Sequence, residues 1–166
     1  MNVRGFQQMV IRLERRRFLR ATGALVFSII GETLELSAAR ADEAPPDFRV
    51  IVHPENPNRS VSRRFIADVF LKDISRWDGG EAARPVDLRS DSPVRGRFSE
   101  RVIRRSVSAV RSYWQQRIFS GRSLPPPELD TDEDVVRYVQ RDRGAVGYVS
   151  GRADIGKVRS LIVTYD

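Results

Sequence analysis

Two stretches near opposite ends of the chain constrain its fold most. Residues 65–80 place apolar side chains at helical spacing and then end in the turn Trp77-Asp78-Gly79-Gly80. The second stretch, Gly144-Ala-Val-Gly-Tyr-Val149, is short, apolar and glycine-bounded, which is typical of a buried strand. Because a helix with one apolar face and an apolar strand each need a covering layer, the pair predicts α/β packing.

Apolar spacing and turn residues extend this pattern over residues 48–166. Ser92 followed by Pro93 resembles a helix cap with proline in the first turn, and Thr131-Asp-Glu-Asp134 resembles a capping box. The expected elements are a strand over 48–53, a helix capped by Ser60 or Ser62, a strand over 85–88, helices from Ser92, over 107–118 and after Thr131, and strands over 145–149 and 159–164. Such alternation predicts one small mixed sheet flanked by helices.

The N-terminus predicts export. Arg15-Arg16-Arg17-Phe18-Leu19-Arg20 resembles a twin-arginine motif, which the export machinery would recognise through Arg15 and Arg16. An uncharged apolar run follows over residues 21–31, too short for a comfortable membrane span. Ala39-Arg40-Ala41 supplies a small-x-small cleavage pattern. We therefore expect a signal peptide over 1–41 cleaved after Ala41, a linker over 42–47 and a periplasmic domain over 48–166. A buried helix with a basic flank is the alternative interpretation.

The leader also accounts for much of the positive charge. The whole chain has a formal net charge of +7, and residues 1–41 contribute seven arginines against three glutamates. The remaining 125 residues therefore carry 22 basic and 19 acidic side chains, a net charge of +3. No basic run in them is interleaved with aromatic residues, as a single-strand nucleic-acid platform requires. Nucleic acid is accordingly not an expected partner.

Few residues of catalytic or metal-binding type are present. The chain has no cysteine and one histidine, His53, so thiolate sites and histidine-rich metal sites are excluded. The acidic residues 130–134 lack the alternation and glycine of a calcium loop, and a helix N-terminus explains them better. No nucleophile–base pair or metal cluster is recognisable. The sequence thus predicts a protein that is not an enzyme and needs no cofactor.

The two stretches together resemble the phosphate-type (PstS-like) family of periplasmic solute-binding proteins. In that family a helix ending near Ile-Phe-x-Gly-Lys leads to a Trp-Asn/Asp turn, and a Gly-Ala-Ile-Gly-Tyr strand follows later. Here Asp68-Val-Phe-Leu-Lys72, Trp77-Asp78-Gly79 and Gly144-Ala-Val-Gly-Tyr148 stand in those places, with Leu71 where glycine is common. The resemblance covers about Phe48 to Val149. It implies one lobe of a fold that normally encloses its solute between two.

The resemblance also points to an anion site. The family holds the anion at a helix N-terminus with Ser-Gly-Thr, where backbone N–H groups and the helix dipole favour negative charge. When Phe98 is set on the phenylalanine that follows this motif, Ser92-Pro93-Val94 falls on Ser-Gly-Thr. Proline removes one N–H donor and valine replaces a hydroxyl group. The donor set is therefore depleted.

Neighbouring residues rebuild part of this set. The positions of the family's arginine and aspartate hold Leu88 and Ser90, while Arg89 and Asp91 stand one residue away from each. Arg95, on the first turn, can offer a guanidinium group to an oxyanion. The candidate ligand-binding residues are therefore Arg89, Ser90, Ser92 and Arg95.

Three classes of function follow from these expectations. The first is an exported single-lobe module for uptake or sensing, which binds phosphate or a similar oxyanion weakly, or completes the cleft with a second copy, a transporter or a sensor protein. The second is a one-lobed domain that has lost solute binding and acts as a periplasmic protein-interaction module. An enzyme is the third and least favoured class.

Overall fold

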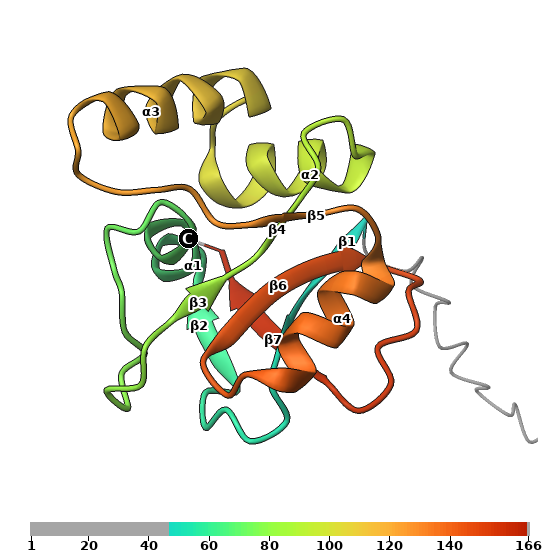
Figure 1. Ribbon diagram of the computed structural model, residues 1–166. Helices are drawn as coiled ribbons and strands as arrows, with labels where there is room; N and C mark the ends of the chain where they lie inside the picture. Colours follow the sequence, from blue (N-terminus) through green and yellow to red (C-terminus); the bar gives the residue numbers. More distant parts are fainter. Residues whose placement is uncertain (1–46, 166) are drawn as a thin grey trace, which may run out of the picture. The chain divides into compact units, whose positions relative to one another are not determined.

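A computed structural model describes residues 47–165 of the chain (Figure 1). The expected signal peptide, its cleavage after Ala41, the export arginines Arg15 and Arg16, and residues 42–46 of the expected linker lie outside the described residues. The elements are β1 (Phe48–Val52), β2 (Ser60–Ser62), α1 (Arg63–Phe70), β3 (Arg84–Pro85), β4 (Asp87–Leu88), α2 (Pro93–Phe98), the π-helix η1 (Ser99–Ile103), α3 (Val107–Phe119), β5 (Glu128–Leu129), α4 (Asp132–Arg141), β6 (Ala145–Ser150) and β7 (Arg159–Thr164).

The main sheet has five strands in the order β2-β7-β1-β6-β3, and β4 and β5 form a separate two-stranded sheet. Strand β1 runs antiparallel to β6 and β7, whereas β2 is parallel to β7 and β3 is parallel to β6. The sheet is therefore mixed. The predicted fold class, a small mixed α/β sheet flanked by helices, is confirmed.

Helices cover both faces of the central strands (Figure 1). Gly147 of β6 faces Val135 and Val139 of α4. The next residue, Tyr148, points to the opposite face, where its ring packs against Phe70 of α1 and Phe98 of α2. This alternation is the period-two geometry of a strand. It explains why β6 carries no charged residue and why its residues 145–149 are all buried, since both faces of the strand are covered.

The helix starts follow the sequence signals. The Ser62 hydroxyl group accepts a hydrogen bond from the Phe65 N–H at 3.1 Å, and Thr131 does the same for the Asp134 N–H at 3.1 Å. Ser92 is the N-cap of α2 with Pro93 in the first turn, but its side chain makes no capping hydrogen bond. The expected caps at Ser62, Ser92 and Thr131 are therefore confirmed in position.

Three features differ from the sequence expectations. The strand expected over 85–88 is divided, because β3 pairs with β6 while β4 leaves the main sheet to pair with β5. Helix α2 continues into η1, which ends at Arg104 in the left-handed conformation (φ 62°). The spacing of residues 107, 110, 114 and 118 predicts one inner face for α3, but Ile118 is 46% exposed and the helix buries Val110 and Trp114 alone.

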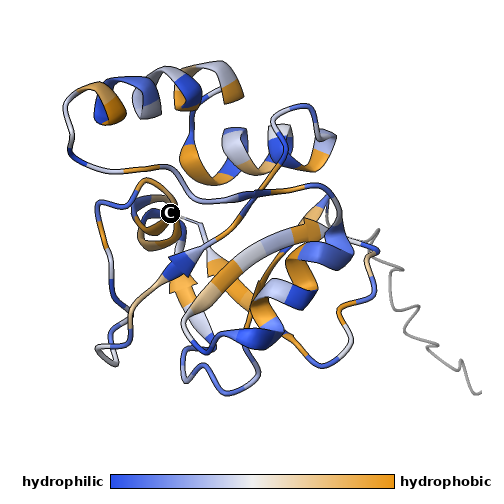
Figure 2. Cartoon of the chain, viewed as in Figure 1, coloured by the Kyte–Doolittle hydropathy of each residue, from blue (hydrophilic) through white to orange (hydrophobic). Residues whose placement is uncertain are grey.

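Helix α3 lies apart from the main sheet, beside η1 (Figure 1). Hydrophilic and hydrophobic residues are mixed around it, whereas α4 separates them into two faces (Figure 2). Among the described residues, no helix combines the length and the apolar character that a membrane span requires.

Candidate functional site

A buried ion pair lies beneath the segment predicted to bind an anion. Arg95 Nη1 lies 2.5 Å from Asp87 Oδ1 and donates a hydrogen bond to the Leu88 carbonyl oxygen at 2.7 Å. The Tyr148 hydroxyl group donates a hydrogen bond to Asp87 from β6. Arg95 is 4% exposed and Asp87 is 3% exposed. Because these contacts join α2, β4 and β6, they hold both ends of the intervening loop, residues 89–92.

Burial controls the ionisation of this cluster. Desolvation raises the pKa of Asp87 to about 6, although the Arg95 charge and the Tyr148 hydrogen bond act in the opposite direction. Burial and the neighbouring Asp87 charge also raise the pKa of Tyr148. At neutral pH the Asp87 carboxylate is therefore ionised and matches Arg95, while Tyr148 keeps its proton and donates it to the hydrogen bond.

The loop above the ion pair carries the other predicted residues. Arg89 Nη2 lies 2.8 Å from Asp91 Oδ2, and its Nη1 lies 3.6 Å from Asp130 Oδ1. The Ser92 N–H donates to the Arg89 carbonyl oxygen at 3.0 Å and closes a turn. Since the Ser92 hydroxyl group is not used in capping, it remains available to a ligand.

The structure divides the four predicted residues into two groups. Ser90 and Arg95 line one pocket together with Arg111 of α3, whose Nη2 donates to Ser90 Oγ at 3.0 Å. Arg89 and Ser92 lie on the loop and do not line that pocket. The Nη1 group of Arg95 is engaged by Asp87 and Leu88. Through these contacts Arg95 holds the loop in position, and it also forms part of the pocket wall.

Sequence reasoning missed Arg111 as a member of this site. Arg111 lies 21 positions from Ser90 and belongs to a helix of mixed polarity. An arginine on such a helix has the pattern of a solvated side chain. Only the placement of α3 above β4 and β5 brings it to the loop, so no local signal identified it.

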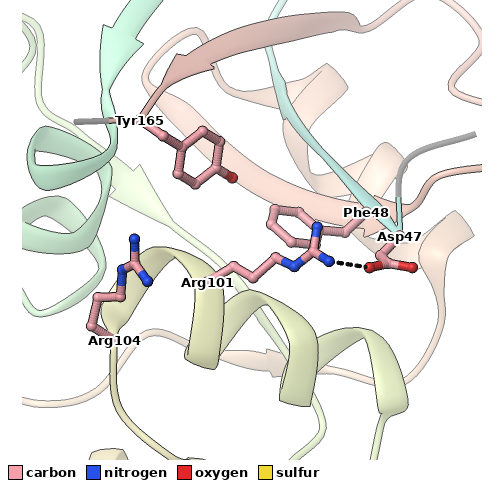
Figure 3. A pocket seen from close by; sticks show the side chains of 5 residues that line it. All are labelled: Asp47, Phe48, Arg101, Arg104 and Tyr165. Atoms are coloured by element: carbon pink, nitrogen blue, oxygen red, sulfur yellow. Dashed lines mark ion pairs between the residues drawn. The ribbon is translucent and has the colours of Figure 1, made fainter.

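A second pocket, separate from the first, is drawn in Figure 3. Its volume is about 400 Å³, and it is lined by Asp47, Phe48, Arg101, Arg104 and Tyr165. Arg101 Nη2 lies 3.1 Å from Asp47 Oδ2, so the charge of Arg101 is already compensated. None of the four predicted anion-binding residues lines this pocket.

The fold resembles solved solute-binding proteins. A protein from Clostridium perfringens, assigned as a phosphate ABC transporter substrate-binding protein and solved with bound phosphate, has a TM-score of 0.55 at 20% identity, covering 70% of this chain and 44% of that one. An ABC-type phosphate transport receptor from Vibrio cholerae has a TM-score of 0.55 at 16% identity, covering 70% and 46%. PstS from Borrelia burgdorferi has a TM-score of 0.55 at 12% identity, covering 71% and 47%.

No protein-family model and no curated protein sequence matches the chain. The chain spans less than half the length of the solved structures that it resembles. At this level of identity the likeness concerns the fold. Residues 47–165 therefore have the fold of part of a periplasmic solute-binding protein.

Proposed function

We propose that the mature chain is an exported single-lobe module that binds phosphate or a related oxyanion, in uptake or sensing. The observation that carries this proposal is the loop 89–92, held by the buried Asp87–Arg95 pair at the start of α2 in a fold shared with phosphate-binding proteins. Arg89 supplies a guanidinium group and Ser92 an uncommitted hydroxyl group. Ser90 lies between them on the loop, and its hydroxyl group accepts a hydrogen bond from Arg111.

The same structure favours weak binding by the lobe alone. Pro93 offers no N–H donor in the first turn, and Asp91 and Asp130 already engage Arg89. A lobe without its counterpart leaves the ligand open to water, which weakens each polar contact. We therefore propose a dissociation constant of about 1 mM, equivalent to about −4 kcal/mol, for the isolated lobe. A second copy, a transporter or a sensor protein would complete the cleft.

Isothermal titration of the exported protein with phosphate, sulfate and molybdate tests this function. Replacing Arg89 by Gln removes the loop's guanidinium group and should weaken binding about tenfold, the equivalent of about 1.4 kcal/mol. Arg97→Gln is the matched control, because Arg97 is exposed on α2 and carries the same charge. Absence of heat with all three anions at millimolar concentration, or equal binding by both variants, would contradict the proposal.

Export by the twin-arginine route is part of the same proposal. Replacing Arg15 and Arg16 together by Lys should leave uncleaved precursor in the cytoplasm, measured by fractionation and blotting. Normal periplasmic accumulation of the double variant would show that another route exports the protein.

A second candidate function is a protein-interaction module that has lost solute binding. The observation in its favour is a group of exposed apolar side chains at the end of α3 and just after it, namely Ile118, Phe119 and Leu124. Phe119 is 89% exposed. Aromatic residues and arginine are enriched at protein interfaces; Arg117 precedes this group and Arg122 lies between Phe119 and Leu124. Failure of the anion titration would make this function the leading one.

A further inference from the structure

The pocket that contains Ser90 and Arg95 has a chemistry different from that of an inorganic anion site. Its volume is about 180 Å³, smaller than the roughly 300–1,000 Å³ of pockets for drug-sized ligands, so it suits a small metabolite. Val107, Trp114 and Ile118 of α3 line it with apolar surface. Figure 1 shows the chain after α3 running back below that helix to β5, and Pro125 of this segment closes the apolar lining.

Two opposite charges remain in the pocket once the buried pair is taken into account. Asp87, 2.5 Å away, matches the charge of Arg95. Arg111 forms no ion pair within residues 47–165 and donates to the neutral Ser90 hydroxyl group. Glu128 of β5 has a side chain that is 49% exposed and forms a second, longer ion pair with Arg95, its Oε1 lying 3.6 Å from Nη1. Asp87 and Glu128 together therefore carry one negative charge more than Arg95 compensates. The lining therefore offers one cationic and one anionic group to a ligand.

The buried guanidinium group adds an unused donor. Arg95 lines the pocket, and its Nε–H, although buried, has no hydrogen-bond partner among residues 47–165. A buried polar group without a partner is costly, and such groups are normally satisfied by protein, water or ligand. Phosphate would not use the whole of this lining, because it has no positive group for Glu128 and no apolar part for Trp114.

We propose that this pocket binds a small α-amino acid with an apolar side chain. The carboxylate lies toward Arg111 and the ammonium group toward Glu128, so that each charge of the ligand has an opposite partner. The side chain packs against the apolar surface of Val107, Trp114 and Ile118. The pocket adjoins the loop 89–92 through Ser90, but its charged groups are Arg111 and Glu128 instead of Arg89, and it goes beyond the proposed function.

Calorimetric titration of the exported protein with L-valine, L-leucine and L-methionine tests this site. At least one of them should bind, and analogues of leucine that lack the amino group (4-methylpentanoate) or the carboxylate (3-methylbutylamine) should bind at least tenfold more weakly. The proposal is wrong if none of the three amino acids binds at 10 mM, a concentration that corresponds to a binding free energy of about −3 kcal/mol. Equal affinity for leucine and both analogues would overturn it as well.

Variants locate the site. Arg111→Gln and Glu128→Gln should each weaken amino-acid binding at least tenfold, while Arg122→Gln, an exposed arginine beyond the end of α3 that does not line this pocket, should bind like the wild type. Thermal melting shows that each variant is folded. Arg89→Gln should weaken phosphate binding and leave amino-acid binding unchanged, which separates this proposal from the proposed function. Unchanged amino-acid binding by both folded pocket variants would refute the assignment.

Discussion

The indole Nε1–H of Trp77 donates a hydrogen bond to the carbonyl oxygen of Gly144 at 2.9 Å. Trp77 is buried and begins the turn that ends the first of the two stretches that constrain the fold, and Gly144 begins the second. A β-carbon at Gly144 would lie 2.0 Å from the Ala82 carbonyl oxygen, so only glycine permits this approach. The two stretches are therefore two sides of one contact, which explains why they occur together.

Gly147→Ala should destabilise the domain by about 1–3 kcal/mol, the range for overpacking a filled core. The added methyl group would lie 2.5 Å from Val135 Cγ1 and 2.9 Å from Val86 Cγ1, so α4 or β6 must move. The free energy of unfolding in urea measures the effect. Gly79→Ala is the control, because its nearest neighbour would be Pro57 Cγ at 3.9 Å. Equal stability of both variants would contradict the packing of α4 on β6.

Trp114→Ala should cost about 3–5 kcal/mol, as expected for a large buried aromatic residue. Trp114 is 5% exposed, and its ring packs edge to face on that of Tyr113 with 5.1 Å between the ring centroids. Trp114 and Val110 are the buried residues of α3. Ile118→Ala on the same helix should cost less than about 1 kcal/mol because Ile118 is half exposed. A loss below about 1 kcal/mol for Trp114→Ala in urea unfolding would show that α3 is not held by this side chain.

Asp87 should make the domain less stable as the pH rises from about 4 to about 6. Burial raises its folded-state pKa to about 6 from the ordinary 3.8, so the folded state holds the proton more tightly than the unfolded state. Its contribution is therefore complete below the ordinary pKa and is lost as the pH rises through the folded pKa. At about 1.4 kcal/mol per pKa unit, the loss is about 3 kcal/mol.

Asp87→Asn isolates this contribution from those of the other carboxylates. The stability of the wild type relative to the variant should fall between pH 4 and pH 7. If the variant does not fold, the NMR chemical shift of the Asp87 carboxyl carbon can be followed with pH in the wild type, and it should titrate near pH 6. A carboxyl group that titrates below pH 4, or a stability difference that grows with pH, would contradict the dominance of burial.

Local signals predicted the elements whose ends depend on neighbouring residues. The caps at Ser62 and Thr131 and the strand over 159–164 are examples, because a hydroxyl group three residues before an N–H, or a β-branched run, acts within one turn or strand. Strands β4 and β5 were not predicted as a separate sheet. Each has two residues, and they pair across about 40 positions.

The candidate site was less predictable than the fold for a similar reason. Arg95 has the sequence pattern of an available first-turn cation, but its burial depends on Asp87, which lies on another element. The contact between Arg111 and Ser90 depends on where α3 lies. An ion pair or hydrogen bond between two elements produces no repeating pattern in the sequence, so residue spacing alone could not predict these contacts.

Restoring donors at the start of α2 should tighten phosphate binding. Pro93→Gly returns one N–H and Val94→Thr returns one hydroxyl group, and a well-formed hydrogen bond to a charged group is worth about 1.5–3 kcal/mol. The double variant should therefore bind phosphate about ten to a thousand times more tightly in calorimetry. Circular dichroism must first show that it is folded, since loss of the proline weakens the helix start. If the double variant is folded and does not bind phosphate, the assignment of an anion site to the start of α2 is wrong.

A phosphate titration followed by amide NMR of the exported protein tests the central claim most directly. If the lobe binds an oxyanion at the loop 89–92, the backbone amides of residues 89–92, 94 and 95 should shift with saturation at millimolar phosphate, and those of α4 should not. Sodium chloride at equal ionic strength provides the control for general charge screening. Absence of saturable shifts in residues 89–95 up to tens of millimolar phosphate, or shifts confined to another surface, would contradict the assignment of this loop as the binding site.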